Sequence, residues 1–254
     1  MTDNLTYEKR IRIRSEQVDM TRKLRISELF RIMEEASIAH TEALGCTKDK
    51  TLDRGLLWVI ARQSAEIEEL PAYDDEIVIR SWQGNMFQMF FPRIYEIFKG
   101  DRCIIRGYAF WALIDEETRE TIMPEDYGIS IPSRPGSEDF YLQAVVIPKD
   151  SEPSFSTETV IRFSQVDING HMNNTRYFDV IDDVIWEKYP PEDPGDAAAP
   201  RSILANYVNE LRIGENFVLN VYEQLPDKTE NAESVTRLFE GVGDRLKFKI
   251  RVSY

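Results

Sequence analysis

Arg14–Asp19 (RSEQVD) recurs 148 positions later as Arg162–Asp167 (RFSQVD), and this internal repeat decides the fold of the chain. The same shift places Phe178 over Phe30. Self-similarity at a fixed separation is the mark of a duplicated structural unit. We therefore predict two copies of one domain in tandem.

Each copy begins with a strand, continues through a short polar loop and enters a helix. Alternating apolar and polar residues predict strands over Tyr7–Arg14 and Thr159–Phe163. Apolar residues at three- and four-residue spacing predict the helices, with Ser27 and then Thr175 at the N-cap. Further strand-like runs follow each helix: Leu56–Ile67, Glu76–Gln83, Gln88–Phe98, Asp101–Ile114, Ser202–Leu211, Asn216–Leu225, Ala232–Glu240 and Leu246–Val252.

These elements predict an α+β fold in which each copy wraps an antiparallel sheet around one long helix, since that buries the apolar faces of both. Prolines and glycines interrupt the chain between the copies. We place the N-terminal domain at residues 1–132, a linker at 133–156 and the C-terminal domain at 157–254. Apolar clusters at Phe140–Leu142 and Val145–Ile147 indicate that the linker packs on the surface.

Composition excludes several classes of protein. The 254 residues carry a formal net charge of −14, which disfavours nucleic-acid binding because an acidic surface repels phosphates. Two cysteines and two histidines argue against a zinc site and for a reducing compartment. No signal peptide or membrane span is evident, so we expect a cytoplasmic protein without metal or other cofactor.

The two copies differ most at the loop that enters the helix. Asp167, Asn169 and His171 occupy alternate positions there, beside the free N–H groups of the helix start. Such a corner can hold an imidazole by a carboxylate, position a water with an amide and stabilise an oxyanion. Lys23 stands in the first copy where His171 stands in the second, so catalysis is expected in the second copy.

A structural interpretation of the same residues remains open. Asp and Asn favour turns and helix caps without any catalytic role. Asn173 and Asn174 at the helix start fit either capping or lining of a pocket. His40 falls inside the first predicted helix, and we interpret it as structural.

The chain resembles the acyl-acyl carrier protein thioesterases, which are double hotdog proteins, over nearly its whole length. The second copy matches the family's Asp-x-Asn-x-His-x-Asn-Asn signature at Asp167–Asn174. Leu56–Arg62, Arg80–Trp82 and Trp111–Asp115 are similar to the family's first hotdog domain. The resemblance implies two tandem hotdog domains, with the acyl chain bound in the first and catalysis in the second.

A further site residue follows from the resemblance alone. Tyr207–Glu210 matches a Tyr-x-x-Glu stretch that carries the family's remaining active-site acid, so Glu210 inherits that role. Plant members often have a cysteine directly after this glutamate, but this chain has Leu211. Since neither Cys46 nor Cys103 falls in the matching region, a cysteine mechanism is excluded.

The expected reaction is hydrolysis of a fatty acyl thioester. Glu210 and His171 bind and deprotonate a water, Asp167 orients the imidazole, and Asn169 holds the water or the carbonyl. N–H groups at the start of the second helix stabilise the oxyanion. A covalent route, in which Asp167 or Glu210 attacks first and forms an acyl anhydride, stays open.

The expected partner is an acyl carrier protein loaded with a fatty acyl chain, and a homodimer of double-hotdog chains is an open possibility. The carrier protein is itself acidic, so a local cationic patch is needed for docking. Candidates, which fit ordinary solvated charge equally well, are Arg22, Lys23, Arg25, Arg176 and Arg201. Met33, in the middle of the first helix, is our candidate for a residue that limits acyl chain length.

Three alternative functions share parts of this pattern. A hotdog enoyl-thioester hydratase carries Asp-x-Asn-Pro-x-His, one residue longer than the loop here and with a proline where this chain has Gly170. An acyl-CoA thioesterase would share the chemistry and differ in the carrier. A non-catalytic acyl-thioester binding protein should lack the His171 and Glu210 pair.

Overall fold

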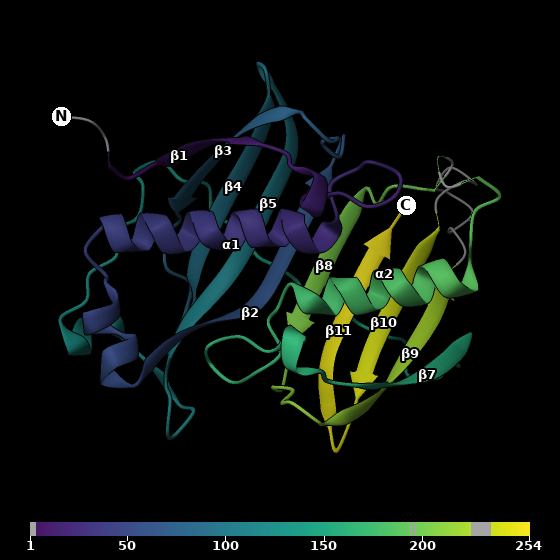
Figure 1. Cartoon of the computed structure of the whole chain (residues 1–254). Coiled ribbons are helices and arrows are strands. Elements are labelled where there is room, and N and C mark those ends of the chain that lie inside the picture. Colours follow the sequence, from purple (N-terminus) through teal and green to yellow (C-terminus); the bar gives the residue numbers. More distant parts are fainter. Residues whose placement is uncertain (1–3, 194, 196, 225–234) are drawn as a thin grey trace. The chain divides into compact units, whose positions relative to one another are not determined.

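The computed structural model describes residues 4–193, 195, 197–224 and 235–254. It divides into two compact units (Figure 1). Unit 1 comprises Met1–Gln63 and Glu68–Leu142, and unit 2 comprises Ser64–Ile67 and Gln143–Tyr254. The division falls inside the predicted linker 133–156. The end of one strand, Ser64–Ile67, belongs to unit 2 although its sequence lies within the first copy.

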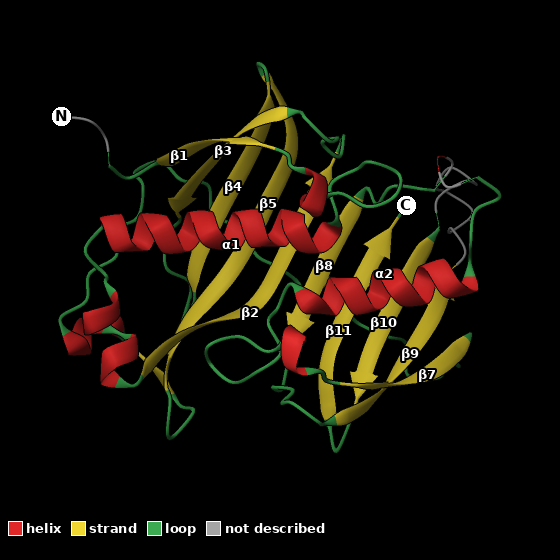
Figure 2. Ribbon diagram, viewed as in Figure 1, coloured by secondary structure: helices red, strands yellow, loops and turns green. Residues whose placement is uncertain are grey.

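Unit 1 places one long helix, α1 (Ile26–Ala43), across an antiparallel sheet (Figures 1 and 2). The strands lie in the order β1-β3-β4-β5-β2, and β6 pairs with β5. Their bounds are β1 Tyr7–Arg12, β2 Leu56–Ile67, β3 Glu76–Gln83, β4 Phe91–Lys99, β5 Arg102–Asp115 and β6 Thr121–Ile122. Short 3-10 turns occupy Ser15–Gln17, Lys48–Lys50, Leu52–Arg54 and Pro124–Tyr127.

Unit 2 repeats this plan with a shorter helix, α2 (Arg176–Lys188). Its own strands lie in the order β8-β11-β10-β9-β7. Their bounds are β7 Phe155–Val160, β8 Ser202–Tyr207, β9 Asn216–Gln224, β10 Thr236–Val242 and β11 Leu246–Ser253. The end of β2 adds to this unit, since the Ile67 N–H donates to the Arg201 carbonyl at 2.8 Å.

The core of each unit lies between its helix and its sheet. Leu29, Phe30 and Met33 of α1 are almost completely buried, as are Phe178 and Ile181 of α2. These residues lie on one helical face, and burying them against the sheet contributes hydrophobic stabilisation. The apolar stripes predicted from the sequence are therefore the faces that pack on the sheets.

Several predicted element boundaries were wrong. The predicted strand Thr159–Phe163 lies earlier, as β7 at Phe155–Val160, and Phe163–Gln165 is a 3-10 turn. The predicted strands Tyr7–Arg14 and Gln88–Phe98 are Tyr7–Arg12 (β1) and Phe91–Lys99 (β4). Ser27 is not the N-cap of α1: the N-cap is Arg25, and Ser27 is buried inside the first turn. The predicted strand Ser202–Leu211 ends as β8 at Tyr207, so Glu210 lies in the loop after the strand. Thr175 is the N-cap of α2, as predicted. Of the predicted strand Ala232–Glu240, residues 232–234 lie outside the described residues.

The first part of the linker packs on unit 1, and the part after Leu142 packs on unit 2. In unit 1 the Arg134 guanidinium lies 4.6 Å from the centre of the Trp82 ring, and Phe140 stacks on Phe110. In unit 2 the Val145 N–H donates to the Asn206 side chain. The predicted apolar clusters are only partly buried, since Val146 is 72% exposed.

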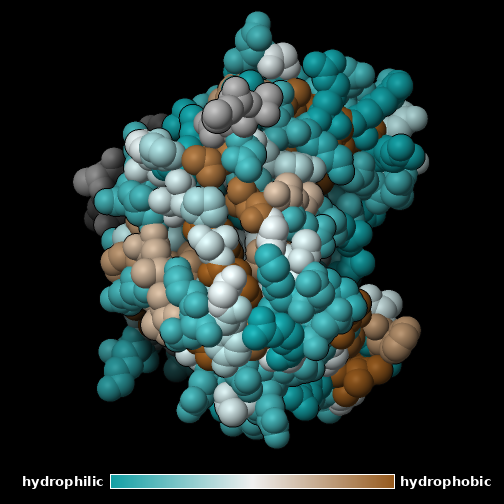
Figure 3. Space-filling model, turned by 90° about the vertical axis from the view of Figure 1, so that its left-hand side faces the viewer, coloured by the Kyte–Doolittle hydropathy of each residue, from teal (hydrophilic) through white to brown (hydrophobic). Residues whose placement is uncertain are grey.

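The face of the molecule in Figure 3 is mainly hydrophilic, with hydrophobic side chains in small separate groups. This matches a sequence in which 30% of residues are charged. Within the described residues, no helix combines the length and hydrophobicity needed to cross a membrane.

Candidate active site

A tight loop carries the predicted catalytic residues into α2. The Asp167 N–H donates to the His171 carbonyl at 3.0 Å, and the Gly170 N–H donates back to the Asp167 carbonyl at 3.1 Å. Gly170 has a φ of +77°, a left-handed conformation that glycine adopts without strain. The loop closes on itself and presents the His171 side chain at its end.

A second segment holds this loop from the side. The Met172 N–H donates to the Leu211 carbonyl at 2.7 Å, and His171 forms an isolated β-bridge with Arg212. The residue before Leu211 is Glu210. Backbone pairing therefore sets the glutamate side chain beside the histidine, although they are far apart in sequence.

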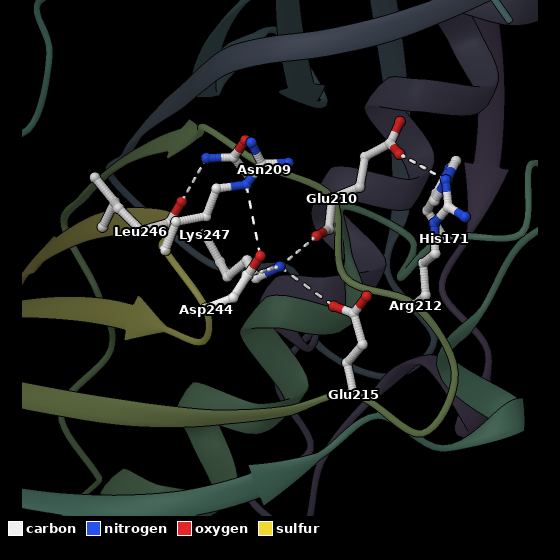
Figure 4. A network of polar contacts seen from close by, with 9 residues as sticks. His171, Asn209, Glu210, Arg212, Glu215, Asp244, Leu246 and Lys247 are labelled. Carbon is white, nitrogen blue, oxygen red and sulfur yellow. Dashed lines mark hydrogen bonds and ion pairs between the residues drawn. The ribbon is translucent and has the colours of Figure 1, made fainter. Parts of the chain in front are cut away.

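His171 and Glu210 are in direct contact (Figure 4). The imidazole Nε2 lies 2.8 Å from Glu210 Oε2. The His171 side chain is 12% exposed and that of Glu210 is 36% exposed, so the pair is sheltered and still reached by solvent. An ionised carboxylate can only accept, so Nε2 is the donor. Arg212, which is 60% exposed, places Nη2 3.7 Å from the same carboxylate oxygen.

Asp167 and Asn169 lie in the same loop and shape it. Asp167 Oδ1 accepts a hydrogen bond from the Asn169 N–H at 2.8 Å, which is an Asx turn. Asp167 therefore stabilises the turn, as the structural interpretation of this residue predicts. The carboxylate in contact with the imidazole is that of Glu210.

The start of α2 contains both predicted asparagines. Asn173 Oδ1 accepts from the Thr175 N–H at 3.0 Å and from its hydroxyl at 2.6 Å, so Asn173 fixes the entry to the helix. Asn174 accepts a hydrogen bond from the Tyr207 hydroxyl at its carbonyl oxygen, at 2.9 Å. Its Nδ2 atom is buried and has no hydrogen-bond partner among the described residues. An amide donor is therefore left to serve a ligand.

Tyr177 shows how strongly the site is charged. Burial raises the pKa of its hydroxyl, and the nearby carboxylates of Glu210, Asp167 and Glu215 raise it further. The tyrosine ring packs edge to face on Phe248 at 4.8 Å. The site therefore combines carboxylates with an apolar floor, which is a setting for acid–base chemistry.

Sequence reasoning missed Lys247, which lies beneath the Glu210 segment (Figure 4). Its side chain is 5% exposed, and Nζ lies 3.2 Å from the Glu210 carbonyl oxygen. Lys247 occupies a polar position of the alternating run Lys247–Val252, so the pattern predicts an exposed side chain and contains no signal of its burial.

Unit 1 contains a different polar cluster. His40, 2% exposed, places Nδ1 2.6 Å from Arg93 Nη1 and Nε2 2.8 Å from the Asn4 carbonyl. The Tyr95 hydroxyl lies 2.6 Å from Ser37 Oγ on α1. Burial lowers the pKa of Arg93 to about 10, which leaves the guanidinium charged at neutral pH. This cluster joins α1 to β4, a structural role for His40.

The two cysteines and His171 belong to different units. Both cysteines belong to unit 1, where Cys46 is buried among Leu56, Leu113 and Ile129. Burial raises the pKa of the Cys46 thiol, which keeps it protonated and unreactive. Among the described residues, no group of three or more histidine, cysteine, aspartate or glutamate side chains could hold a metal ion.

Comparison with protein families gives two adjacent matches. The family model described as "Acyl-ACP thioesterase N-terminal domain" matches residues 4–128, and the one described as "Acyl-ACP thioesterase C-terminal domain" matches residues 148–246. Together they cover most of the chain.

Curated relatives share about a quarter of their residues with this chain over the aligned part. The chloroplastic acyl-acyl-carrier-protein hydrolase FATB3 of Cuphea viscosissima is 24% identical over 190 residues, which cover 69% of this chain and 46% of the relative. The chloroplastic oleoyl-acyl carrier protein thioesterase 2 of Arabidopsis thaliana is 24% identical over 195 residues, covering 70% of this chain and 53% of the relative. The chain spans about half the length of the curated relatives it matches.

Solved structures match over nearly the whole chain. The 12:0-ACP thioesterase from Umbellularia californica has a TM-score of 0.80 at 19% identity, covering 98% of this chain and 93% of that one. An acyl-ACP thioesterase from Bacteroides thetaiotaomicron has a TM-score of 0.74 at 19% identity, covering 98% of both chains. The predicted α+β fold of two tandem hotdog domains is confirmed.

Proposed function

The chain belongs to the acyl-ACP thioesterase family, and we propose that it hydrolyses fatty acyl-acyl carrier protein thioesters to free fatty acids. The observation that carries the proposal is the 2.8 Å contact between His171 Nε2 and Glu210 Oε2, at the start of α2. It joins the only histidine of unit 2 to an acid from a separate segment. Such a pair can take a proton from water as the water attacks a thioester.

In the proposed mechanism, His171 and Glu210 bind a water and take its proton as its oxygen attacks the thioester carbonyl carbon. The Asn174 amide donor at the start of α2 stabilises the oxyanion, because the Thr175 and Arg176 N–H groups already donate to Asn173. The C–S bond then breaks, and the proton passes to the leaving sulfur. Asn169 holds the water or the carbonyl, and Asp167 shapes the loop that orients the imidazole.

The covalent alternative predicts a different fate for the water oxygen. In a single turnover in ¹⁸O-labelled water, direct attack puts the label into the fatty acid. Attack by Asp167 or Glu210 followed by hydrolysis at the enzyme carboxyl puts the label into the protein. Label in the protein after one turnover identifies the covalent route, whereas label in the fatty acid means that water attacked the acyl carbon, either in the thioester or in the anhydride.

The alternative functions are less well supported. The relatives that match over most of this chain are named hydrolases or thioesterases of acyl carrier protein substrates, not hydratases. The His171–Glu210 contact argues against a non-catalytic binding protein. An acyl-CoA thioesterase would use the same pair, so carrier preference needs a direct test.

We assign acyl-chain binding to residues 1–132 and catalysis to residues 157–254, joined by the linker 133–156. The partner is an acyl carrier protein carrying a fatty acyl chain, and the cytoplasm is the proposed location. A homodimer stays a prediction that sedimentation of the purified protein will test.

The decisive experiment incubates the purified protein with matched acyl-acyl carrier protein, acyl-CoA and enoyl thioesters. Release of free thiol and fatty acid from the carrier-protein substrate, at a higher kcat/KM than from acyl-CoA, supports the proposal. Hydration of the enoyl thioester without thiol release indicates a hydratase, and binding without any product indicates a sensor.

A further inference from the structure

Lys247 is a buried cation in unit 2 for which the proposed reaction gives no role so far. It lies in β11, its side chain is 5% exposed, and a lysine is seldom buried without partners. Its Nζ atom contacts Asp244 Oδ1 at 2.7 Å and Glu215 Oε2 at 3.3 Å. These two carboxylates compensate the buried charge.

The third partner of the ammonium is the Glu210 main chain. Lys247 Nζ donates to the Glu210 carbonyl oxygen at 3.2 Å (Figure 4). The Lys247 main chain also holds the two residues that precede Glu210. The Lys247 carbonyl accepts from the Val208 N–H at 2.8 Å and from the Asn209 N–H at 2.9 Å. One residue thus fixes the loop from Val208 to Glu210 at three points.

The backbone around Lys247 leaves room for its side chain. A Cβ atom built on Gly243 would lie 2.9 Å from Lys247 Cε and 3.3 Å from the Asn216 carbonyl oxygen. Glycine at this position therefore lets the lysine stem lie across the end of the β10–β11 hairpin. The placement of the ammonium depends on more than its ion pairs.

Unit 1 provides an internal comparison. There the Glu68 and Glu69 N–H groups donate to the Ile104 carbonyl, as Val208 and Asn209 do to Lys247. By this pairing Ile104 corresponds to Lys247, and the next residue, Leu70, corresponds to Glu210. Where the acid is replaced by leucine, the lysine is replaced by isoleucine.

We propose that Lys247 is a positioning residue for catalysis, whose ammonium holds the Glu210 main chain so that its carboxylate meets the His171 imidazole. This rests on the proposed function, in which Glu210 and His171 activate water. A misplacement of about 1 Å can cost about 100-fold in rate, so a flexible attachment of Glu210 is expected to lower kcat. Lys247 itself touches no substrate.

The test uses the full chain and an acyl-acyl carrier protein thioester as substrate. Lys247→Met removes the donors and keeps the length of the stem, and we expect kcat to fall about tenfold with KM changed less than about twofold. The matched control is Lys249→Met, on the same strand. Lys249 pairs with Glu240 at 3.5 Å instead of the Glu210 segment, so its kcat should stay within about twofold of wild type.

A second background separates positioning from general destabilisation. In Glu210→Gln, the carboxylate that Lys247 positions is gone, so adding Lys247→Met should change the remaining rate less than about twofold. An equal tenfold loss in both backgrounds overturns the proposal, as does a wild-type kcat in folded Lys247→Met. If Lys247→Met does not fold, Lys247→Gln, which keeps a shorter donor, carries the same comparison with an expected loss of about threefold.

The outcomes also separate this inference from the proposed function. If Glu210→Gln keeps full activity, the proposed catalytic pair is wrong. If Glu210→Gln is inactive on acyl-acyl carrier protein while Lys247→Met is fully active, the pair stands and the role of Lys247 is rejected.

Discussion

The loops before α1 and α2 share one backbone and differ in chemistry. In unit 1 the Asp19 N–H donates to the Lys23 carbonyl at 3.0 Å, and in unit 2 the Asp167 N–H donates to the His171 carbonyl at the same distance. Lys23 forms a β-bridge with Ala72, as His171 does with Arg212. The scaffold has been kept in both copies.

The side chains on this scaffold have diverged. In unit 1 the Leu24 N–H donates to the Pro71 carbonyl, as the Met172 N–H donates to the Leu211 carbonyl in unit 2. Pro71 therefore corresponds to Leu211, and the residue before it, Leu70, corresponds to Glu210. Lys23 and Leu70 cannot form the contact that His171 and Glu210 make. A conserved loop geometry therefore does not imply a conserved reaction, because the backbone supplies position and the side chains supply chemistry.

The largest expected effect tests which loop is catalytic. His171→Ala, Glu210→Gln and Asp167→Ala should each lower thioester hydrolysis about 100-fold or more, the usual scale for acid–base groups. Lys23→Ala, at the matching position of unit 1, should leave kcat unchanged. If Lys23→Ala loses turnover and His171→Ala keeps it, the reaction takes place in unit 1 and the assignment of catalysis to unit 2 is wrong.

The second prediction asks whether unit 1 has a different task, the choice of chain length. Met33 is 2% exposed on the buried face of α1, and Met33→Trp should shift products toward shorter acyl chains, since one methylene is worth about 1–3 kcal/mol in a hydrophobic pocket. Ile181, equally buried at the matching position of α2, is the control. Product profiles across acyl chains from octanoyl to stearoyl check this.

For Met33→Trp, melting temperature must be measured beside the profile, because overpacking a core destabilises by about 1–3 kcal/mol. A folded, active Met33→Trp variant with the wild-type profile removes Met33 from the acyl site. The same shift in Ile181→Trp would mean that chain length is not chosen by unit 1 alone.

The third prediction concerns the strain in the two loops. Arg22 and Gly170 occupy matching positions with φ of +64° and +77°. Gly170→Ala should lower the free energy of unfolding by about 1 kcal/mol, and Arg22→Gly should raise it by about 0.5 kcal/mol, because only glycine adopts this conformation without strain. Urea denaturation measures both. Equal and negligible changes would show that neither loop is strained.

The smallest expected effect is a pH dependence that belongs to unit 1. Burial lowers the pKa of His40 below its ordinary value of 6.5. The hydrogen bond to the Asn4 carbonyl raises this pKa, and the charge of Arg93 lowers it, so the net shift is downward. The unfolded chain then binds a proton that the folded chain does not, so stability declines as pH falls below about 6.5 and the decline ends near the folded-state pKa.

The midpoint of urea denaturation, measured from about pH 7.5 to about pH 5 in wild type and in His40→Gln, tests this dependence. The glutamine can accept from Arg93 and does not titrate, so its midpoint should vary less with pH. An unchanged slope in His40→Gln rejects the assignment.

The sequence predicted the duplication, both helices and the loop at Asp167–Asn174, since each has a period or a motif. Glu210 followed only from family resemblance, because nothing local links it to His171. Ser27 was misplaced because a serine near an apolar run suits an N-cap, yet the N-cap is Arg25, two residues earlier, and α1 begins at Ile26. Lys247 and Arg93 were missed because a lone cation in a strand has no sequence signature for burial.

The shared strand β2 has a consequence for how these two copies could separate in evolution. Residues Ser64–Ile67 lie early in the sequence and belong structurally to unit 2, where Ile67 bonds to Arg201. A gene split between Leu142 and Gln143 would leave unit 2 without one of its own strand segments.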